Sequence, residues 1–265
     1  MKEIIFKSYF FIIICVICVP FSFAQQNKID SLLTLVRNEN DGTEKIFHMA
    51  DLCLNYTYSG DYEKAMNYGN AALQLSNKLN VKQGLSKSYI YIGFIYDMQG
   101  NYEQALEYYF KSLKIDEELA ASSDKAVAIS GKKGMSDCYN NIGYIHNVQG
   151  NYKQSLEYCT KSLKIRKEIL EQVNLSGDSN EIREGKHDVA ISYNNIGNVY
   201  FDQCDYSNAL KNYFASLTIA EELGIKREIA SSFVNIGNIY LVKGDKSNEK
   251  GNIAATDRDF ANALE

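Results

Sequence analysis

The chain repeats one pattern along most of its length. The clearest copy opens with Tyr-Ile-Tyr-Ile-Gly-Phe-Ile-Tyr at residues 89–96, continues with Gln-Gly-Asn-Tyr at residues 99–102 and closes with Lys-Ser-Leu-Lys-Ile at residues 111–115. Further copies begin at residues 49 (degenerate), 139, 193 and 233. One such unit cannot bury its own hydrophobic face, so neighbouring copies must stack to form a core. The repeat therefore predicts a linear array of similar units.

Each copy is predicted to form two helices joined by a turn. Tyr193, Ile196, Gly197 and Tyr200 are spaced so that they lie on one stripe of a first helix. A Gly-Asn or Gly-Asp step follows, where Gly can adopt a left-handed backbone and Asn or Asp can cap the second helix. Small residues in both helices predict close contact between them: Gly93, Gly143, Gly197 and Gly237 in the first, and Ala65, Ala105 and Ala209 in the second. The one proline is Pro20, so an all-α fold is expected beyond it.

This frame resembles the tetratricopeptide repeat, whose pattern is aromatic-x2-Leu-Gly-x2-Tyr followed by Ala-x3-aromatic. The resemblance covers about residues 44–265 and implies an α-solenoid, a right-handed superhelix of antiparallel helix pairs. The usual Trp opener is Tyr or Phe here, and the closing Pro is absent. The glycine slot recurs after 40, 50, 54 and 40 residues, from Cys53 to Gly237, against about 34 in the standard repeat. The basic unit is therefore predicted to be a 40-residue variant with longer helices.

The predicted organisation follows from these spacings. Three insertions are expected: residues 120–125 with 131–134, and residues 174–180, as surface loops, and residues 246–256 inside the turn of the last copy. The expected segments are a signal peptide (1–24), an N-terminal helix and linker (25–43), and repeats at 44–81, 82–121, 122–180 with flanking insertions, 181–224, and 225–265, the last interrupted and truncated.

The first 24 residues have the features of an export signal. Lys2 and Lys7 precede an apolar run over residues 9–19, Pro20 ends it, and small residues lead to Ala24. Cleavage after Ala24 and an extracytoplasmic or periplasmic location are therefore predicted. The alternative is a retained membrane anchor, but the run is shorter than the roughly 20 apolar residues that span a bilayer.

The last copy breaks off at Glu265, inside its second helix, which predicts that the sequence is the front part of a longer protein; a natural stop is the alternative. Two functions follow from the resemblance. The first is an exported scaffold that binds proteins or peptides on its concave face. The second is the N-terminal sensor portion of a bacterial signal-transduction protein, with a membrane span and a histidine kinase, nucleotide cyclase or transcriptional regulator beyond Glu265.

The sequence contains little that indicates chemistry. A net charge of −5 with scattered Lys and Arg disfavours nucleic acid as a partner. None of the three histidines has a metal-ligating neighbour, and no phosphate-binding or dinucleotide motif occurs. This segment is therefore expected to have no catalytic residue, cofactor or metal. His146 stands in a tyrosine slot and is predicted to be a core residue, and buried free thiols are predicted at Cys53, Cys138, Cys159 and Cys204.

The candidate binding residues lie beside the tyrosine and glycine slots of the first helix, which lines the concave face in the family. They are Asn141, Asn195, Asn235, Asn140, Asn194, Asn198, Asn238, Phe94, Tyr144 and Lys87. An Asn carboxamide both donates and accepts, so such rows can pair with the backbone of an extended peptide. The alternative is that these side chains only bond neighbouring backbone. Lys87 alone does not form a carboxylate clamp, so a neutral or polar peptide is expected.

Overall fold

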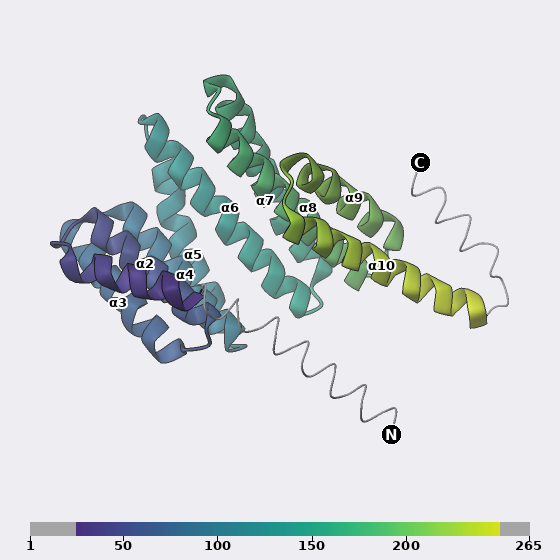
Figure 1. The fold of residues 1–265 in the computed structure, drawn as a ribbon, viewed down its shortest axis with the longest axis horizontal. Helices are drawn as coiled ribbons and strands as arrows, with labels where there is room; N and C mark the ends of the chain where they lie inside the picture. Colours follow the sequence, from purple (N-terminus) through teal and green to yellow (C-terminus); the bar gives the residue numbers. More distant parts are fainter. Residues whose placement is uncertain (1–24, 250–265) are drawn as a thin grey trace. The chain divides into compact units, whose positions relative to one another are not determined.

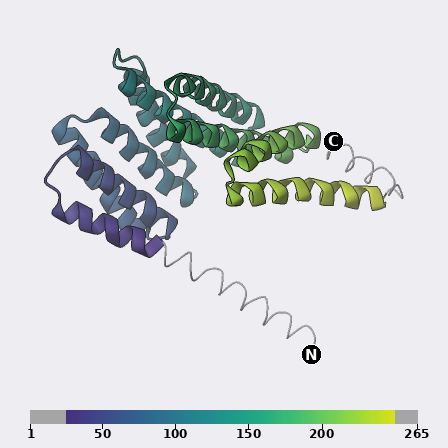
Figure 2. The same ribbon diagram turned by 45° about the horizontal axis from the view of Figure 1, so that its top comes forward.

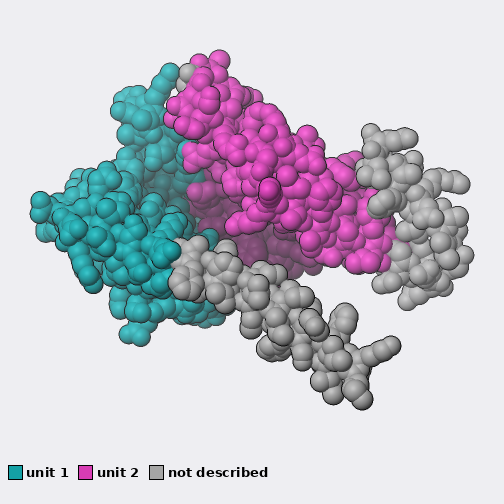
Figure 3. All heavy atoms as spheres, viewed as in Figure 1, with its two compact units in different colours: residues 1–134 teal, residues 135–265 magenta. Residues whose placement is uncertain are grey.

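The structure is a computed structural model that describes residues 25–249. The predicted signal peptide and the start of the last second helix lie outside the described residues. Within them all regular structure is helical (Figure 1). The chain divides into two compact units, residues 1–134 and residues 135–265 (Figure 3).

The helices alternate between first and second helices of successive repeats. Unit 1 starts with a helix over residues 25–38, and α6 spans the unit boundary. The first helices are α2 (Thr43–Tyr58), α4 (Lys82–Met98), α6 (Lys125–Val148), α8 (Ser179–Asp202) and α10 (Lys226–Glu249). The second helices are α3 (Tyr62–Leu79), α5 (Tyr102–Ala120), α7 (Tyr152–Ser176) and α9 (Tyr206–Leu223). In unit 2, α8, α9 and α10 lie side by side (Figures 1 and 2), which is the packing of helical repeats.

The turns inside the repeats follow the predicted chemistry. Gly60, Gly100 and Gly150 have φ values of 79°, 75° and 75°, in the left-handed region. Cys204 takes the same place in the fourth repeat with φ 59°, where a side chain is unfavourable. The predicted caps form at two of the turns: the carboxylates of Asp61 and Asp205 each accept a backbone N–H of the second helix, at 3.1 and 3.2 Å. Asn101 and Asn151 make no such bond.

The glycine slot of each first helix receives a large side chain from the second helix of the same repeat. A Cβ on Gly93 would lie 2.8 Å from the ring of Tyr109, and one on Gly197 would lie 2.6 Å from the ring of Tyr213. Both tyrosines are fully buried. The glycines are therefore needed for packing within a repeat, because any larger residue would displace these rings.

The same slot is filled differently in other repeats. The thiol of Cys159 occupies the space beside Gly143, with 2.7 Å between Sγ and an added Cβ. In the first repeat the larger and the smaller residue are exchanged between the helices, because Cys53 stands in the first helix and Gly69 in the second. Beside Gly237 no atom of the described residues lies within 4 Å of an added Cβ. The predicted close contact at this glycine is not made by the part of the chain that the structure describes.

The prediction that the two long links form surface loops is right only for residues 121–124 and 177–178, which lie between helices. Residues 125–134 extend the start of α6, and the second insertion extends α7 to Ser176 before α8 begins at Ser179. Gly131 and Gly134 allow α6 to approach α5 closely, because an added Cβ would lie 2.3 Å from the backbone nitrogen of Ala120 or 2.4 Å from the carboxylate of Asp116.

The polar residues of the two insertions act as helix caps. The carboxylate of Asp124 accepts the N–H groups of Ala126 and Val127 at the start of α6. Asp178 accepts two N–H groups at the start of α8, after Gly177 has ended α7 in a left-handed conformation. The Ser, Asp and Gly residues of these two links therefore mark helix boundaries. Of the third predicted insertion, residues 246–249 continue α10, and the rest lies outside the described residues.

The four cysteines of the described range are thiols without disulfides, as predicted, and Cys53, Cys138 and Cys159 are buried. Burial raises the pKa of Cys53 to about 12 and that of Cys159 to about 11, so both thiols stay protonated. The prediction of burial is wrong for Cys204, which is exposed because it stands at the turn.

A buried arginine fixes the helices that carry the candidate site. Arg166 on α7 is 6% exposed. Its guanidinium donates to Asp137 Oδ1 on α6 at 2.8 Å, and to Ser192 Oγ and the Asp188 carbonyl oxygen on α8 at 3.0 Å. These charge-assisted bonds satisfy the buried cation and hold α6 and α8 to the helix between them.

Candidate functional site

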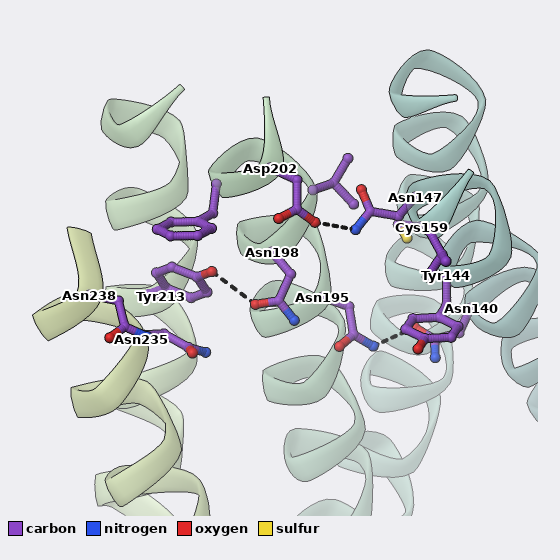
Figure 4. A pocket seen from close by; sticks show the side chains of 13 residues that line it. Asn140, Tyr144, Asn147, Cys159, Asn195, Asn198, Asp202, Tyr213, Asn235 and Asn238 are labelled. Atoms are coloured by element: carbon purple, nitrogen blue, oxygen red, sulfur yellow. Dashed lines mark hydrogen bonds between the residues drawn. The ribbon is translucent and has the colours of Figure 1, made fainter. Parts of the chain in front are cut away.

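Unit 2 contains a groove rich in carboxamides, which we call the asparagine groove (Figure 4). It has a volume of about 290 Å³. Three first helices line it, α6, α8 and α10, with one residue each from α7 and α9. The lining residues are Asn140, Tyr144, Asn147, Val148, Cys159, Asn195, Asn198, Val199, Phe201, Asp202, Tyr213, Asn235 and Asn238.

Asparagine side chains connect the successive first helices. Asn195 on α8 donates its Nδ2 to Oδ1 of Asn140 on α6 at 2.7 Å, and Asn235 on α10 donates its Nδ2 to Oδ1 of Asn194 on α8 at 2.9 Å. In both pairs the acceptor stands three residues before the glycine slot of its helix, and the donor stands two residues before the glycine slot of the next first helix. The expected alternative, bonds to neighbouring backbone, is not what these residues make. Each pair keeps a carbonyl oxygen on the donor and an N–H on the acceptor for another partner.

Two further asparagines present unpaired groups. Asn198 Oδ1 accepts the Tyr213 hydroxyl at 2.8 Å, which directs its Nδ2 away from that ring (Figure 4). Burial and, secondarily, the charge of Asp202 raise the pKa of Tyr213, so the hydroxyl remains a donor. Asn238 is exposed and makes no hydrogen bond within the described residues. Both carboxamides are therefore available to a ligand.

One end of the groove combines a carboxylate with an apolar wall. Asn147 donates its Nδ2 to Oδ2 of Asp202 at 2.5 Å, about two helical turns along the same stripes from the Asn140–Asn195 pair (Figure 4). Tyr144 and Val148 stand on α6 beside this pair, and their side chains are 53% and 46% exposed. This end can therefore accept hydrogen bonds and cover apolar groups of a ligand.

The structure brings together six of the ten predicted residues: Asn140, Asn195, Asn198, Asn235, Asn238 and Tyr144 line the groove. Asn194 takes part in an asparagine pair beside it, and half-buried Asn141 does not line it. Phe94 and Lys87 belong to unit 1.

The two predicted residues of unit 1 have partners there. The ring of Phe94 lies edge-on to Tyr58, with 5.4 Å between centroids. The ammonium of Lys87 pairs with Asp51 Oδ1 at 2.9 Å and lies over the rings of Phe47 and Tyr91. Lys87 is therefore held by unit 1, and no observation links it to the asparagine groove.

Sequence reasoning missed Asn147, Val148, Asp202 and Tyr213. A signal for two of them was present, because Asn147 follows Asn140 by seven residues and Asp202 follows Asn195 by seven, which keeps each on its helical stripe. Tyr213 reaches the groove from a second helix, and its role depends on packing against Gly197 that the pattern alone does not reveal.

The described residues provide no arrangement for metal chemistry. Among residues 25–249, no group of three or more His, Cys, Asp or Glu side chains is placed to hold a metal ion. His146 stacks on Tyr158 with 5.5 Å between ring centroids, as expected for a residue in a tyrosine slot. Over the same range, no helix is long and apolar enough to cross a membrane.

The paired helices, their left-handed turns and the carboxamide-lined groove define a helical repeat protein of the α-solenoid class. Models of the tetratricopeptide repeat match residues 45–118 and residues 136–168. The chain therefore contains tetratricopeptide repeats in both of these ranges. Comparison with curated protein sequences gives no match.

Several solved structures have a similar fold. BtubC (BKLC) from P. vanneervenii superposes with a TM-score of 0.60 at 19% identity, over 90% of this chain and 89% of that one. A Rap protein complexed with Competence and Sporulation Factor gives 0.63 at 13%, over 92% and 72%. The apo quorum sensor NprR from B. thuringiensis gives 0.58 at 15%, over 92% and 71%. At these identities the likeness concerns the fold alone.

Proposed function

We propose that this protein is a non-catalytic scaffold that binds an extended peptide segment of a protein partner in the asparagine groove. The observation that carries the proposal is the convergence of six asparagines from three successive first helices on one open groove. The backbone of an extended peptide presents N–H and C=O groups at short regular intervals, and carboxamides can pair with both kinds of group whatever the side chains. The Rap protein that was solved in complex with Competence and Sporulation Factor has a similar fold, which supports binding of this kind.

The test uses Asn238, because its carboxamide makes no hydrogen bond within the described residues. Replacing Asn195 or Asn235 would also break a bond between helices, whereas Asn238→Ala removes groups open to solvent. The full chain is immobilised and offered a randomised pool of short linear peptides with blocked ends. We expect Asn238→Ala to lower peptide capture about tenfold, which corresponds to one or two lost hydrogen bonds of about 1 kcal/mol each.

The matched control is Asn174→Ala, an exposed asparagine on α7 of the same unit. It should capture the pool like the wild type, and both variants should keep the wild-type circular dichroism spectrum. Equal capture by all three proteins, or no capture by the wild type, would contradict peptide binding in the groove.

We further propose that the protein is exported and that these repeats are the sensing portion of a longer signalling protein. The sequence of residues 1–24 supports export, and the fold shared with the quorum sensor NprR supports a sensing role. N-terminal sequencing of protein purified from the envelope should begin at Gln25. Intact Met1 would refute cleavage, and a source gene that stops after Glu265 would refute the longer protein.

A further inference from the structure

We infer that the ligand of the asparagine groove carries a cationic side chain, arginine or lysine, that binds at Asp202. This inference rests on the proposed function and adds a charge requirement to it. Of the residues that line the groove, Asp202 is the single charged one. Burial keeps the thiol of Cys159 and the hydroxyl of Tyr213 protonated and therefore neutral, so Asp202 alone sets the charge of the lining residues.

The backbone around Asp202 adds to its negative potential. Asp202 is the last residue of α8, and α6 ends at Val148 beside it. The carboxyl-terminal end of each helix carries a partial negative charge, so a carboxylate there is unfavourable for the fold and a cation is favourable. Corresponding positions in the preceding first helices hold apolar residues, Met98 and Val148. The fold of the repeat therefore does not require a carboxylate here.

The hydrogen bonds at Asp202 also leave acceptors in excess. Because a carboxylate only accepts, Asn147 must direct its Nδ2 toward Asp202, and its Oδ1 is then buried without a hydrogen-bond donor in the described residues. A guanidinium or ammonium group supplies several N–H donors in one place. Phe201, the residue before Asp202 in the chain, also lines the groove.

The test compares two peptide pools that differ in charge at one site. Both contain short linear peptides with blocked ends and randomised flanks; one has arginine at the central position, and the other has citrulline, which has the same shape without the charge. The wild-type chain should capture the arginine pool about tenfold better. Asp202→Asn should abolish that preference, while Glu171→Gln, which removes an exposed carboxylate of α7, should keep it.

The possible results have distinct meanings. Equal capture of the two pools by the wild type would overturn the charge requirement and leave peptide binding standing. An arginine preference that persists in Asp202→Asn would overturn the assignment to Asp202. No capture of either pool would overturn the proposed function as well. A lower melting temperature for Asp202→Asn with an unchanged preference would show that Asp202 only holds α8 to α6.

Discussion

Alanine in place of Gly197 should destabilise the protein, although alanine is the better helix former. Gly197 lies inside α8. Replacing a glycine inside a helix by alanine stabilises it by about 1 kcal/mol, because glycine loses more backbone freedom on folding. The added methyl group must therefore cost more than this gain for the protein to become less stable.

At Gly197 the same methyl group would overlap a buried ring. It would lie 2.6 Å from a ring carbon of Tyr213, against about 3.5–4.0 Å for an ordinary contact between carbons. Tyr213 is 2% exposed and its hydroxyl is bonded to Asn198, so the ring cannot turn away without losing that bond. Overpacking of this kind costs about 3 kcal/mol. After the helix effect, Gly197→Ala should destabilise the protein by about 2 kcal/mol.

Thermal unfolding followed by far-UV circular dichroism measures the change. For a domain of this size, 1 kcal/mol corresponds to a shift in melting temperature of about 2–4 °C. Gly197→Ala should therefore melt about 4–8 °C below the wild type. A melting temperature of Gly197→Ala at or above that of the wild type would refute the packing of Tyr213 into the glycine slot.

Two other substitutions test local features. Cys204→Gly should raise the free energy of unfolding by about 0.5–1 kcal/mol, because relief of the left-handed conformation outweighs the added freedom of the unfolded chain; urea unfolding measures this, and Cys204→Ala should show no gain. Burial raises the pKa of Asp97 from 3.8 to about 6, so the folded state favours the protonated carboxyl. The stability that protonated Asp97 contributes is therefore lost as pH rises through 6, where the buried carboxyl must become charged. Asp97→Asn should therefore raise the melting temperature at pH near 7.5 and much less near pH 4; an equal shift at both pH values would refute the role of charge.

The repeat in the sequence is sufficient to predict the helix pairs and their turns. Glycine at the position of Gly100 predicts a turn with a left-handed backbone, and glycine at the position of Gly93 predicts a close contact between helices. The structure shows both features. The insertions are easily mistaken for loops, because Ser, Asp and Gly occur in loops and also at helix boundaries. The packing of Gly131 against Ala120 and of Gly134 against Asp116 shows that these glycines belong to a helix and not to a loop.

The candidate site shows the same division. The recurrence of asparagines beside the glycine slot is visible in the sequence alone, because it depends on residues within one helix. Packing between helices determines that Asn195 bonds Asn140, that Tyr213 from a second helix bonds Asn198, and that Asp202 lies at the end of the groove. Most of these contacts depend on the register between helices about 40 or more residues apart, which tertiary packing sets and no local pattern encodes.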